Sequence, residues 1–246
     1  MIPKNKLPSG VFASKMIIGT APFSKIKLPL LEGARILQHG YELGVNFWDT
    51  AELYKTHSYI GEALKHVSRS QVVIISKTFA KTKKDAQKYL NKTLKELGTD
   101  YIDIVLLHSV ESVDDYKSRV MALWHFTQEI EKGKIRMIGV MSDDLKVINE
   151  AIEDEKVDII FMPFNLENQT DEKLKLFQDA KKYGKITAAT KILAEGKLSD
   201  RVKESLVFLF GQKDIDYVCL GVKTIFELET DVNIISNIFN NKAIHV

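Results

Sequence analysis

Short hydrophobic runs alternate with longer amphipathic stretches along the whole chain. The runs are rich in Ile and Val and hydrophobic at successive positions, which is typical of parallel strands covered on both faces. Eight strands are predicted from this pattern, at residues 16–19, 45–48, 72–76, 102–107, 135–140, 159–164, 185–189 and 217–221. The chain is therefore expected to build an α/β fold around a parallel sheet.

Helical spacing fills the stretches between these strands. Residues 86–97 place three leucines on one stripe, and Gly98 follows where a helix C-cap is expected. Residues 143–152 and 171–183 show the same spacing, and both segments begin with acidic residues that suit the positive end of a helix dipole. Helices are predicted at all three places.

Eight strands that are each followed by a helix predict a (β/α)8 TIM barrel, here as one domain over residues 1–246. The alternative is a doubly wound open sheet, which needs a glycine-rich phosphate loop after its first strand. Residues 19–23 read Gly-Thr-Ala-Pro-Phe and contain no such loop, so the barrel is favoured. A short leader at residues 7–15, with a turn at residues 8–10, is expected to form a hairpin that closes the bottom of the barrel.

Composition narrows the class of protein. The 246 residues are 45% hydrophobic and 28% charged, and the net charge is only +2 with scattered lysines, so no nucleic-acid surface is expected. No apolar run of about 18 residues and no signal segment occur, so no membrane span and a cytoplasmic location are expected. No metal site is predicted. The single cysteine, Cys219, lies in an apolar run and is expected to be a buried, inert thiol.

Polar residues stand at the ends of three neighbouring predicted strands. The second strand ends at Asp49 with Tyr54 soon after it, the third ends at Lys77, and the fourth ends at His108. In a barrel of this kind, active-site residues come from the C-terminal strand ends and the loops behind them. A neighbouring ammonium favours the phenolate and so lowers the pKa of a tyrosine, and a carboxylate keeps that ammonium charged. The histidine can orient a substrate carbonyl or share the proton.

Each of these residues also has a structural explanation when it is taken alone. Asp49 could cap the next helix, Lys77 could extend to solvent, and His108 could be a hydrogen-bonded rim residue. The convergence of all four groups on adjacent strand ends favours a catalytic site.

These motifs resemble the aldo-keto reductase family over nearly the whole chain, from Leu7 to about Asn233. The stretches that carry the resemblance are GVNFWDTAELY, VVIISKT, LGTDYIDIVLLHS, KGKIRMIGV and FMPFNL. The resemblance implies reduction of an aldehyde or ketone with a nicotinamide cofactor, with Tyr54 as general acid, Lys77 and Asp49 tuning it, and His108 positioning the carbonyl. It also implies a preference for NADP(H), with NAD(H) as the alternative, and a monomer acting on a small-molecule carbonyl substrate.

The resemblance further implies residues around the cofactor and the substrate. The expected cofactor contacts are Gly19, Thr20, Asp49, Ser142, Lys191, Leu193, Gly221, Val222, Lys223, Thr224 and Asp231. The expected substrate contacts are Phe23, Trp48, Tyr54 and His108, although Phe23 and Trp48 could equally be barrel packing.

Several positions depart from the family pattern on the cofactor side. Met141, Phe161 and Thr190 stand where residues that contact the nicotinamide are usual. Glu227 stands where an arginine often binds the 2′-phosphate, which weakens the case for NADPH, whereas Lys223 supports it. The loops after His108 and after Gly196 are short for the family, which predicts a shallow, open pocket.

Two other functions fit parts of the pattern. A non-catalytic member of the same fold could bind the cofactor as a sensor or regulatory subunit. A Schiff-base aldolase could use Lys77 as its nucleophile, but that role needs a lowered lysine pKa, whereas Asp49 should raise it.

Overall fold

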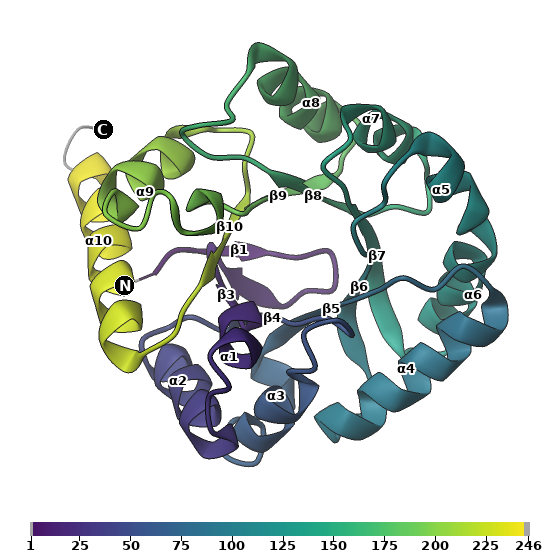
Figure 1. Ribbon diagram of the computed structural model, residues 1–246, viewed down its shortest axis with the longest axis horizontal. Coiled ribbons are helices and arrows are strands. Elements are labelled where there is room, and N and C mark those ends of the chain that lie inside the picture. Colours follow the sequence, from purple (N-terminus) through teal and green to yellow (C-terminus); the bar gives the residue numbers. More distant parts are fainter. Residues whose placement is uncertain (1, 244–246) are drawn as a thin grey trace.

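The computed structural model describes residues 2–243, without the side chains of residues 241–243, and shows a closed barrel of parallel strands inside a ring of helices (Figure 1). The strands run in the order β10-β3-β4-β5-β6-β7-β8-β9 around the barrel. Their bounds are β3 Met16–Gly19, β4 Phe47–Asp49, β5 Val73–Thr78, β6 Ile102–Leu107, β7 Ile135–Met141, β8 Ile159–Pro163, β9 Ile186–Thr190 and β10 Tyr217–Gly221. The predicted (β/α)8 fold is confirmed.

The helices lie between consecutive strands. Their bounds are α1 Ala21–Lys25, α2 Leu30–Glu42, α3 His57–Ala63, α4 Lys83–Leu97, α5 Val113–Ser118, α6 Val120–Glu131, α7 Leu145–Glu153, α8 Asp171–Lys182, α9 Val202–Gly211 and α10 Ile225–Ala243, with short 3-10 turns at Arg69–Gln71 and Ala194–Gly196. Within residues 2–243, no helix combines the length and the hydropathy that crossing a membrane requires.

Local capping explains where the three predicted helices begin and end. Helix α4 starts before residue 86 because the Thr82 side chain accepts a hydrogen bond from the Asp85 N–H, and it ends at Gly98 with a φ of 65°. Helix α7 starts after residue 143 because Asp144 accepts hydrogen bonds from the first N–H groups. Helix α8 ends one residue early, because Tyr183 rather than Gly184 is its C-cap.

Hydrophobic residues form two layers, one inside the barrel and one between the barrel and the helices. The inner layer includes Phe47 on β4 and Ile75 on β5, and the outer layer includes Trp48 and Ile74. Side chains alternate between the two faces along a strand, so Asp49 shares the inner side with Phe47. The buried layers therefore hold Asp49 at the inner wall of the barrel, where its strand ends.

The N-terminal segment forms the predicted hairpin, with slightly different bounds. Strands β1 Lys4–Lys6 and β2 Phe12–Ser14 pair antiparallel, and Leu7 and Val11 beside the turn pack against the inner layer. The Ser14 N–H donates to the Asn46 side chain, just ahead of β4. The hairpin therefore covers the N-terminal end of the barrel, opposite to the strand ends that carry Asp49 and its neighbours.

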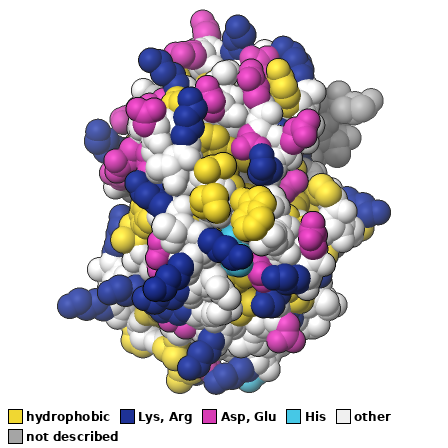
Figure 2. Space-filling view, turned by 90° about the vertical axis from the view of Figure 1, so that its right-hand side faces the viewer, with side chains coloured by type: hydrophobic (Ala, Val, Ile, Leu, Met, Phe, Trp, Pro, Cys, Tyr) yellow, Lys and Arg dark blue, Asp and Glu magenta, His cyan; other side chains and the backbone are white. Residues whose placement is uncertain are grey.

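The outer surface over α5 and α6 mixes charged and apolar side chains. Figure 2 shows hydrophobic side chains gathered near the middle of this face, among side chains of both charge signs. Helix α6 exposes Val120, Met121 and Trp124, and the Lys83 ammonium lies 5.4 Å from the centre of a Trp124 ring. The lysine thus covers part of the tryptophan by a cation–π contact.

Candidate active site

The structure brings the four predicted catalytic side chains together at the C-terminal end of the barrel. Asp49 is the last residue of β4, Lys77 lies in β5, and His108 follows β6 directly. The Lys77 Nζ lies 2.5 Å from Asp49 Oδ1 and donates to the Thr50 carbonyl at 3.1 Å. The same nitrogen lies 4.7 Å from the centre of the Tyr54 ring, and the Tyr54 and His108 rings meet edge to face at 5.5 Å.

Burial and charge set the protonation of the pair at the base of this site. Burial alone would lower the pKa of Lys77, but Asp49 and Tyr54 outweigh it and the pKa lies above its ordinary value. Burial raises the pKa of Asp49, and the Lys77 ammonium acts against that rise. Both side chains are almost inaccessible to solvent, so the ion pair is a fixed part of the wall.

Tyr54 is a protonated phenol in this environment. Burial is the largest influence and raises its pKa above the ordinary value, while the charge of Lys77 and its hydrogen bond to the phenol act in the opposite direction. The predicted effect of the ammonium is present, but in the described chain burial exceeds it. The phenol is therefore a proton donor at neutral pH rather than a phenolate.

His108 is a neutral imidazole at the same place. Burial lowers its pKa most, and the nearby cations Lys77, Arg119 and Lys191 lower it further, to about 3. Its Nδ1 is buried and has no hydrogen-bond partner among residues 2–243. An uncharged ring with an unused nitrogen is suited to hold a polar group of a bound molecule.

Two neighbours of His108 were not predicted from the sequence. The Phe79 ring stacks on the imidazole with 4.9 Å between ring centres and 28° between planes. The buried Arg119 donates to the main-chain carbonyl of His108 at 2.9 Å. Phe79 follows Lys77 by two residues, so its place beyond a strand end was a usable signal, whereas the pattern around Arg119 indicated only a helix surface.

Of the two alternatives given for Phe23 and Trp48, substrate contact and barrel packing, the structure favours packing. Both are fully buried in the layer between the barrel and the helices. Phe23 packs on the Tyr59 ring, and the Trp48 indole N–H lies 3.4 Å from the carbonyl of Val45. The packing alternative describes both residues.

The N-terminus of helix α10 is capped by side chains from the turn in which it begins. The Glu227 N–H donates to Thr224 Oγ1 at 3.1 Å, and the Lys223 N–H donates to Glu227 Oε2 at 2.8 Å, which resembles a capping box with the second donor one residue before the N-cap. Gly221 is exposed at the end of β10, while Val222 is buried. Burial and the charge of Glu227 raise the pKa of Asp231, one turn further along, to about 7.

These residues could hold a phosphate-bearing ligand, and they carry charges of both signs. Gly221 exposes a backbone free of a side chain, and a Cβ there would lie 2.9 Å from Pro22 Cγ. The exposed ammonium of Lys223 lies at the N-terminus of helix α10, and a cation at a helix N-terminus suits a pyrophosphate group. Glu227 places a carboxylate against the same turn and opposes additional negative charge.

The remaining predicted cofactor residues line the same end of the barrel, but their side chains have partners in the protein. Gly19 pairs with Gly221 and with Asp49 in the sheet. Thr20 donates to the Asp49 carbonyl at 2.8 Å, and the Ser142 hydroxyl donates to the Val110 carbonyl.

Lys191 and Leu193 lie beyond β9. The Lys191 ammonium pairs with Asp143 at 2.7 Å, and Leu193 is half-buried ahead of a 3-10 turn. Lys191 has a φ of 51°, in the left-handed region that lysine rarely adopts. The Asp143 carboxylate therefore holds the Lys191 ammonium at the open end of the barrel, so solvent is not its only partner.

Two of the residues that depart from the family pattern lie inside the barrel. Met141 and Phe161 are buried inside the barrel, with neighbouring positions in β7 and β8.

Cys219 is a buried free thiol, and burial raises its pKa well above the ordinary value, as expected for an unreactive cysteine. No cluster of three or more His, Cys, Asp or Glu residues in the described chain is arranged to hold a metal ion.

A second polar constellation resembles a hydrolytic triad but lies outside the barrel. His57 Nε2 is 2.7 Å from the Ser76 hydroxyl, and its Nδ1 is 2.9 Å from a Glu96 carboxylate oxygen. Ser76 is completely buried behind β5, on the side opposite to Lys77, so no substrate can reach the hydroxyl. The group holds α3 and α4 against the strand.

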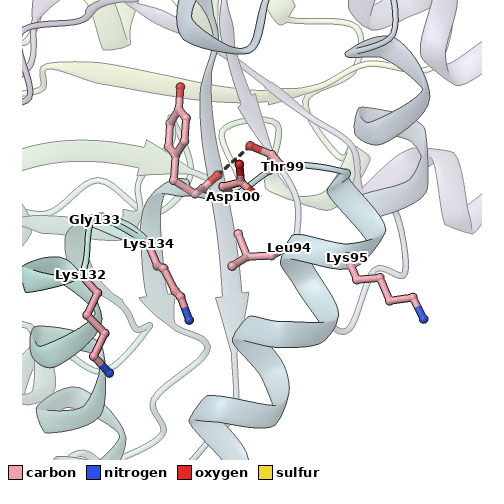
Figure 3. A pocket seen from close by; sticks show the side chains of 8 residues that line it. Leu94, Lys95, Thr99, Asp100, Lys132, Gly133 and Lys134 are labelled. Carbon is pink, nitrogen blue, oxygen red and sulfur yellow. Dashed lines mark hydrogen bonds between the residues drawn. The ribbon is translucent and has the colours of Figure 1, made fainter.

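A cavity of about 620 Å³ lies far from the four catalytic candidates (Figure 3). It is lined by Leu94, Lys95, Thr99, Asp100, Tyr101, Lys132, Gly133 and Lys134. These residues precede β6 and β7, so the cavity opens at the N-terminal end of the barrel. Lys132 and Lys134 pair with Glu129, and the cavity brings no catalytic group together.

Comparison with known proteins finds similarity to one family of enzymes. A family model described as "Aldo/keto reductase family" matches residues 15–217. Methylglyoxal reductase DkgA of Escherichia coli (strain K12) is 32% identical over 125 residues, which cover 49% of this chain and 44% of that enzyme. The uncharacterized oxidoreductase YqkF of Bacillus subtilis (strain 168) is 28% identical over 160 residues, or 58% of this chain and 51% of that protein. The chain spans about half the length of the curated relatives it matches.

Solved structures share the fold at lower sequence identity. Aldo-keto reductase AKR11C1 from Bacillus halodurans, in its holo form, superposes with a TM-score of 0.84 at 21% identity. The alignment covers 96% of this chain and 91% of that one. The two proteins therefore share the same overall fold.

Proposed function

The chain belongs to the aldo/keto reductase family, and from that premise we propose that it reduces an aldehyde or ketone to an alcohol with a nicotinamide dinucleotide. The observation that carries the proposal is the meeting of a protonated phenol, an ammonium, a carboxylate and a neutral imidazole at one end of the barrel. Mere binding of a cofactor would not require all four groups.

In the proposed reaction, Tyr54 donates its phenolic proton to the carbonyl oxygen as negative charge develops there. Lys77 remains protonated beside the phenol and stabilises the phenolate that is left behind. His108, uncharged and in contact with the Tyr54 ring, holds the carbonyl oxygen through a ring nitrogen. A bound nicotinamide dinucleotide supplies the hydride to the carbonyl carbon.

The proposed substrates are small carbonyl compounds. The E. coli relative is named a methylglyoxal reductase, and the match with it spans less than half of either protein. Phe79 and Leu53 are the exposed apolar side chains closest in sequence to Lys77 and Tyr54, so the mouth offers limited apolar contact. We therefore propose short aldehydes and ketones, bound with weak selectivity, rather than one large substrate.

For the cofactor, we propose NADP(H) as the preferred form, with NAD(H) as a competing one. Lys223 supports the preference by its exposed positive charge, and Glu227 opposes it. The expected result is a narrow preference rather than an exclusive one.

The Schiff-base alternative receives no support from the site. A lysine nucleophile must be unprotonated, but Asp49 at 2.5 Å holds the pKa of Lys77 above its ordinary value. Borohydride trapping of a lysine adduct with a carbonyl substrate would argue for that alternative instead.

The proposal is tested by fluorescence titration with NADPH and NADH, followed by turnover of a panel of aldehydes and ketones that includes methylglyoxal. We expect binding of at least one cofactor at micromolar concentration and reduction of several short aldehydes. Binding without any carbonyl reduction would favour a sensor or regulatory subunit. Absence of binding by both cofactors would contradict the proposal.

A further inference from the structure

Arg119 is buried between α5 and α6 and donates in two directions. Its Nη1 donates to the His108 carbonyl at 2.9 Å, and its Nη2 contacts a carboxylate oxygen of Asp115. The other oxygen of Asp115 pairs with Lys81 at 2.8 Å, so two cations share one carboxylate. The Arg119 Nε is buried and has no hydrogen-bond partner in the described part of the chain.

The same guanidinium also approaches the ring that covers His108. Its central carbon lies 5.9 Å from the centre of the Phe79 ring, and Phe79 stacks on the His108 imidazole at 4.9 Å. Tyr54 meets the imidazole edge to face at 5.5 Å. One arginine therefore fixes the backbone of His108 directly and contacts the ring that holds its side chain.

A buried guanidinium with an unused donor is costly for a residue that only fills space. Removing a charged group from water is unfavourable unless its hydrogen bonds are replaced. An apolar residue would pack between two helices at lower cost. The Arg119 guanidinium instead lies where both its charge and its hydrogen bond act on His108.

From these contacts we infer that Arg119 is a positioning residue for the reaction, which fixes His108 through its carbonyl and through Phe79. The inference rests on the proposed function, in which His108 holds the substrate carbonyl. Three cations face His108, namely Lys77 from β5, Lys191 from beyond β9 and Arg119. Each of the three has a carboxylate partner, Asp49 for Lys77, Asp143 for Lys191 and Asp115 for Arg119.

Charge and contact can be separated by two substitutions of Arg119. In Arg119→Met the cation and both hydrogen bonds are lost, whereas Arg119→Lys keeps a positive charge and loses the forked contact. For Arg119→Met we expect kcat to fall by about tenfold to a hundredfold with unchanged cofactor affinity. For Arg119→Lys we expect a smaller fall in kcat.

The pH dependence separates a positioning role from a general structural one. The wild type should show no histidine inflection in kcat/KM above about pH 4, because the pKa of His108 is about 3. Arg119→Met should move that inflection upward, because it removes one of the cations that lower the pKa of His108, while Arg119→Lys should not. Arg201→Met is the matched control, because Arg201 also precedes a helix and pairs with an acid, Glu204, but is exposed.

An NMR titration of the His108 imidazole gives the same answer without turnover. Its pKa should rise in Arg119→Met and stay low in Arg119→Lys, even if no substrate is found, so failure of the inference is distinct from failure of the proposed function. If Arg119→Met does not fold, Arg119→Lys and Phe79→Leu decide: wild-type kcat in both would overturn the inference. An unchanged His108 titration and unchanged kcat in a folded Arg119→Met would also overturn it.

Discussion

Among single residues, Lys77 depends on one counter-charge. Its ammonium is almost fully buried and has two oxygen partners, the Asp49 carboxylate and the Thr50 carbonyl. Only the first carries charge, so Asp49 determines whether Lys77 remains an ammonium. The proposed tuning of Tyr54 depends on that state.

Asp49→Asn is expected to weaken both stability and catalysis. The substitution leaves a buried lysine without its counter-ion, which costs about 3–5 kcal/mol of unfolding free energy and lowers the lysine pKa. Urea denaturation and kcat measure the two effects. The control is Asp179→Asn, because Asp179 is only half-buried and pairs with the exposed Lys182. Unfolding midpoints that agree between the two variants would contradict this role of Asp49.

The four catalytic candidates could be predicted because each lies at or just beyond the C-terminal end of a buried strand, where barrels carry chemistry. The face of a residue inside a doubly buried strand could not, because Phe47 and Trp48 are equally hydrophobic and only the register decides which one points inward. That is why the sequence left Trp48 open between substrate contact and barrel packing. Arg119 was missed because its importance comes from a distant carbonyl, which no local pattern indicates.

At the scale of elements, the start of α10 combines a cation and a carboxylate within one turn. The capping box uses Glu227 to satisfy the Lys223 N–H, so the helix begins without an external partner. This arrangement follows from the order of residues along the turn. The charges of Lys223 and Glu227, rather than the shape of the turn, are expected to affect the binding of a phosphate-bearing ligand.

Glu227→Gln is expected to favour NADPH. Glutamine can keep the cap but removes a negative charge close to the proposed phosphate site, so NADPH affinity should rise by about fivefold, or about 1 kcal/mol, with little change for NADH. Titration with both cofactors measures the ratio. Glu229→Gln on the same helix is the control, since Glu229 pairs with His39 instead. Equal gains for both cofactors would contradict discrimination by Glu227.

Strand positions were predicted to within two residues at each end, and the differences have local causes. Strand β4 begins two residues late because the Val45 N–H bonds to the Gly40 carbonyl in the preceding turn. Strand β5 extends to Thr78, which places Lys77 inside the sheet rather than at its end. Lys77 pairs in register with Leu106 and is held by the ladder, which restricts its backbone.

In the whole molecule, stability and chemistry are placed at opposite ends of the barrel. The hairpin of β1 and β2 covers the N-terminal end, and the catalytic candidates occupy the C-terminal end. The hydrophobic periodicity predicted a closed barrel with two distinct ends, because a chain with eight alternations of strand and helix has few other ways to close its sheet. The depth of the pocket depends on loops whose conformation no periodic pattern specifies.

Leu7→Ala is expected to destabilise the protein without affecting turnover. Leu7 is buried against the inner layer, so truncation should cost about 2–4 kcal/mol of unfolding free energy. Thermal or urea unfolding measures this cost, and kcat and KM should equal the wild-type values. Phe12→Ala in the same hairpin is the control, because Phe12 is 56% exposed. A change in kcat for a folded Leu7→Ala would show that the two ends are coupled.

The most direct test of the central claim is turnover by Tyr54→Phe, measured together with cofactor affinity. The phenylalanine keeps the ring contact with His108 and removes only the proton that the reaction is proposed to use. Carbonyl reduction should fall by about 10²- to 10⁴-fold, while fluorescence titration should give the wild-type affinity for NADPH and NADH. A Tyr54→Phe variant that reduces aldehydes at the wild-type rate would contradict Tyr54 as the proton donor.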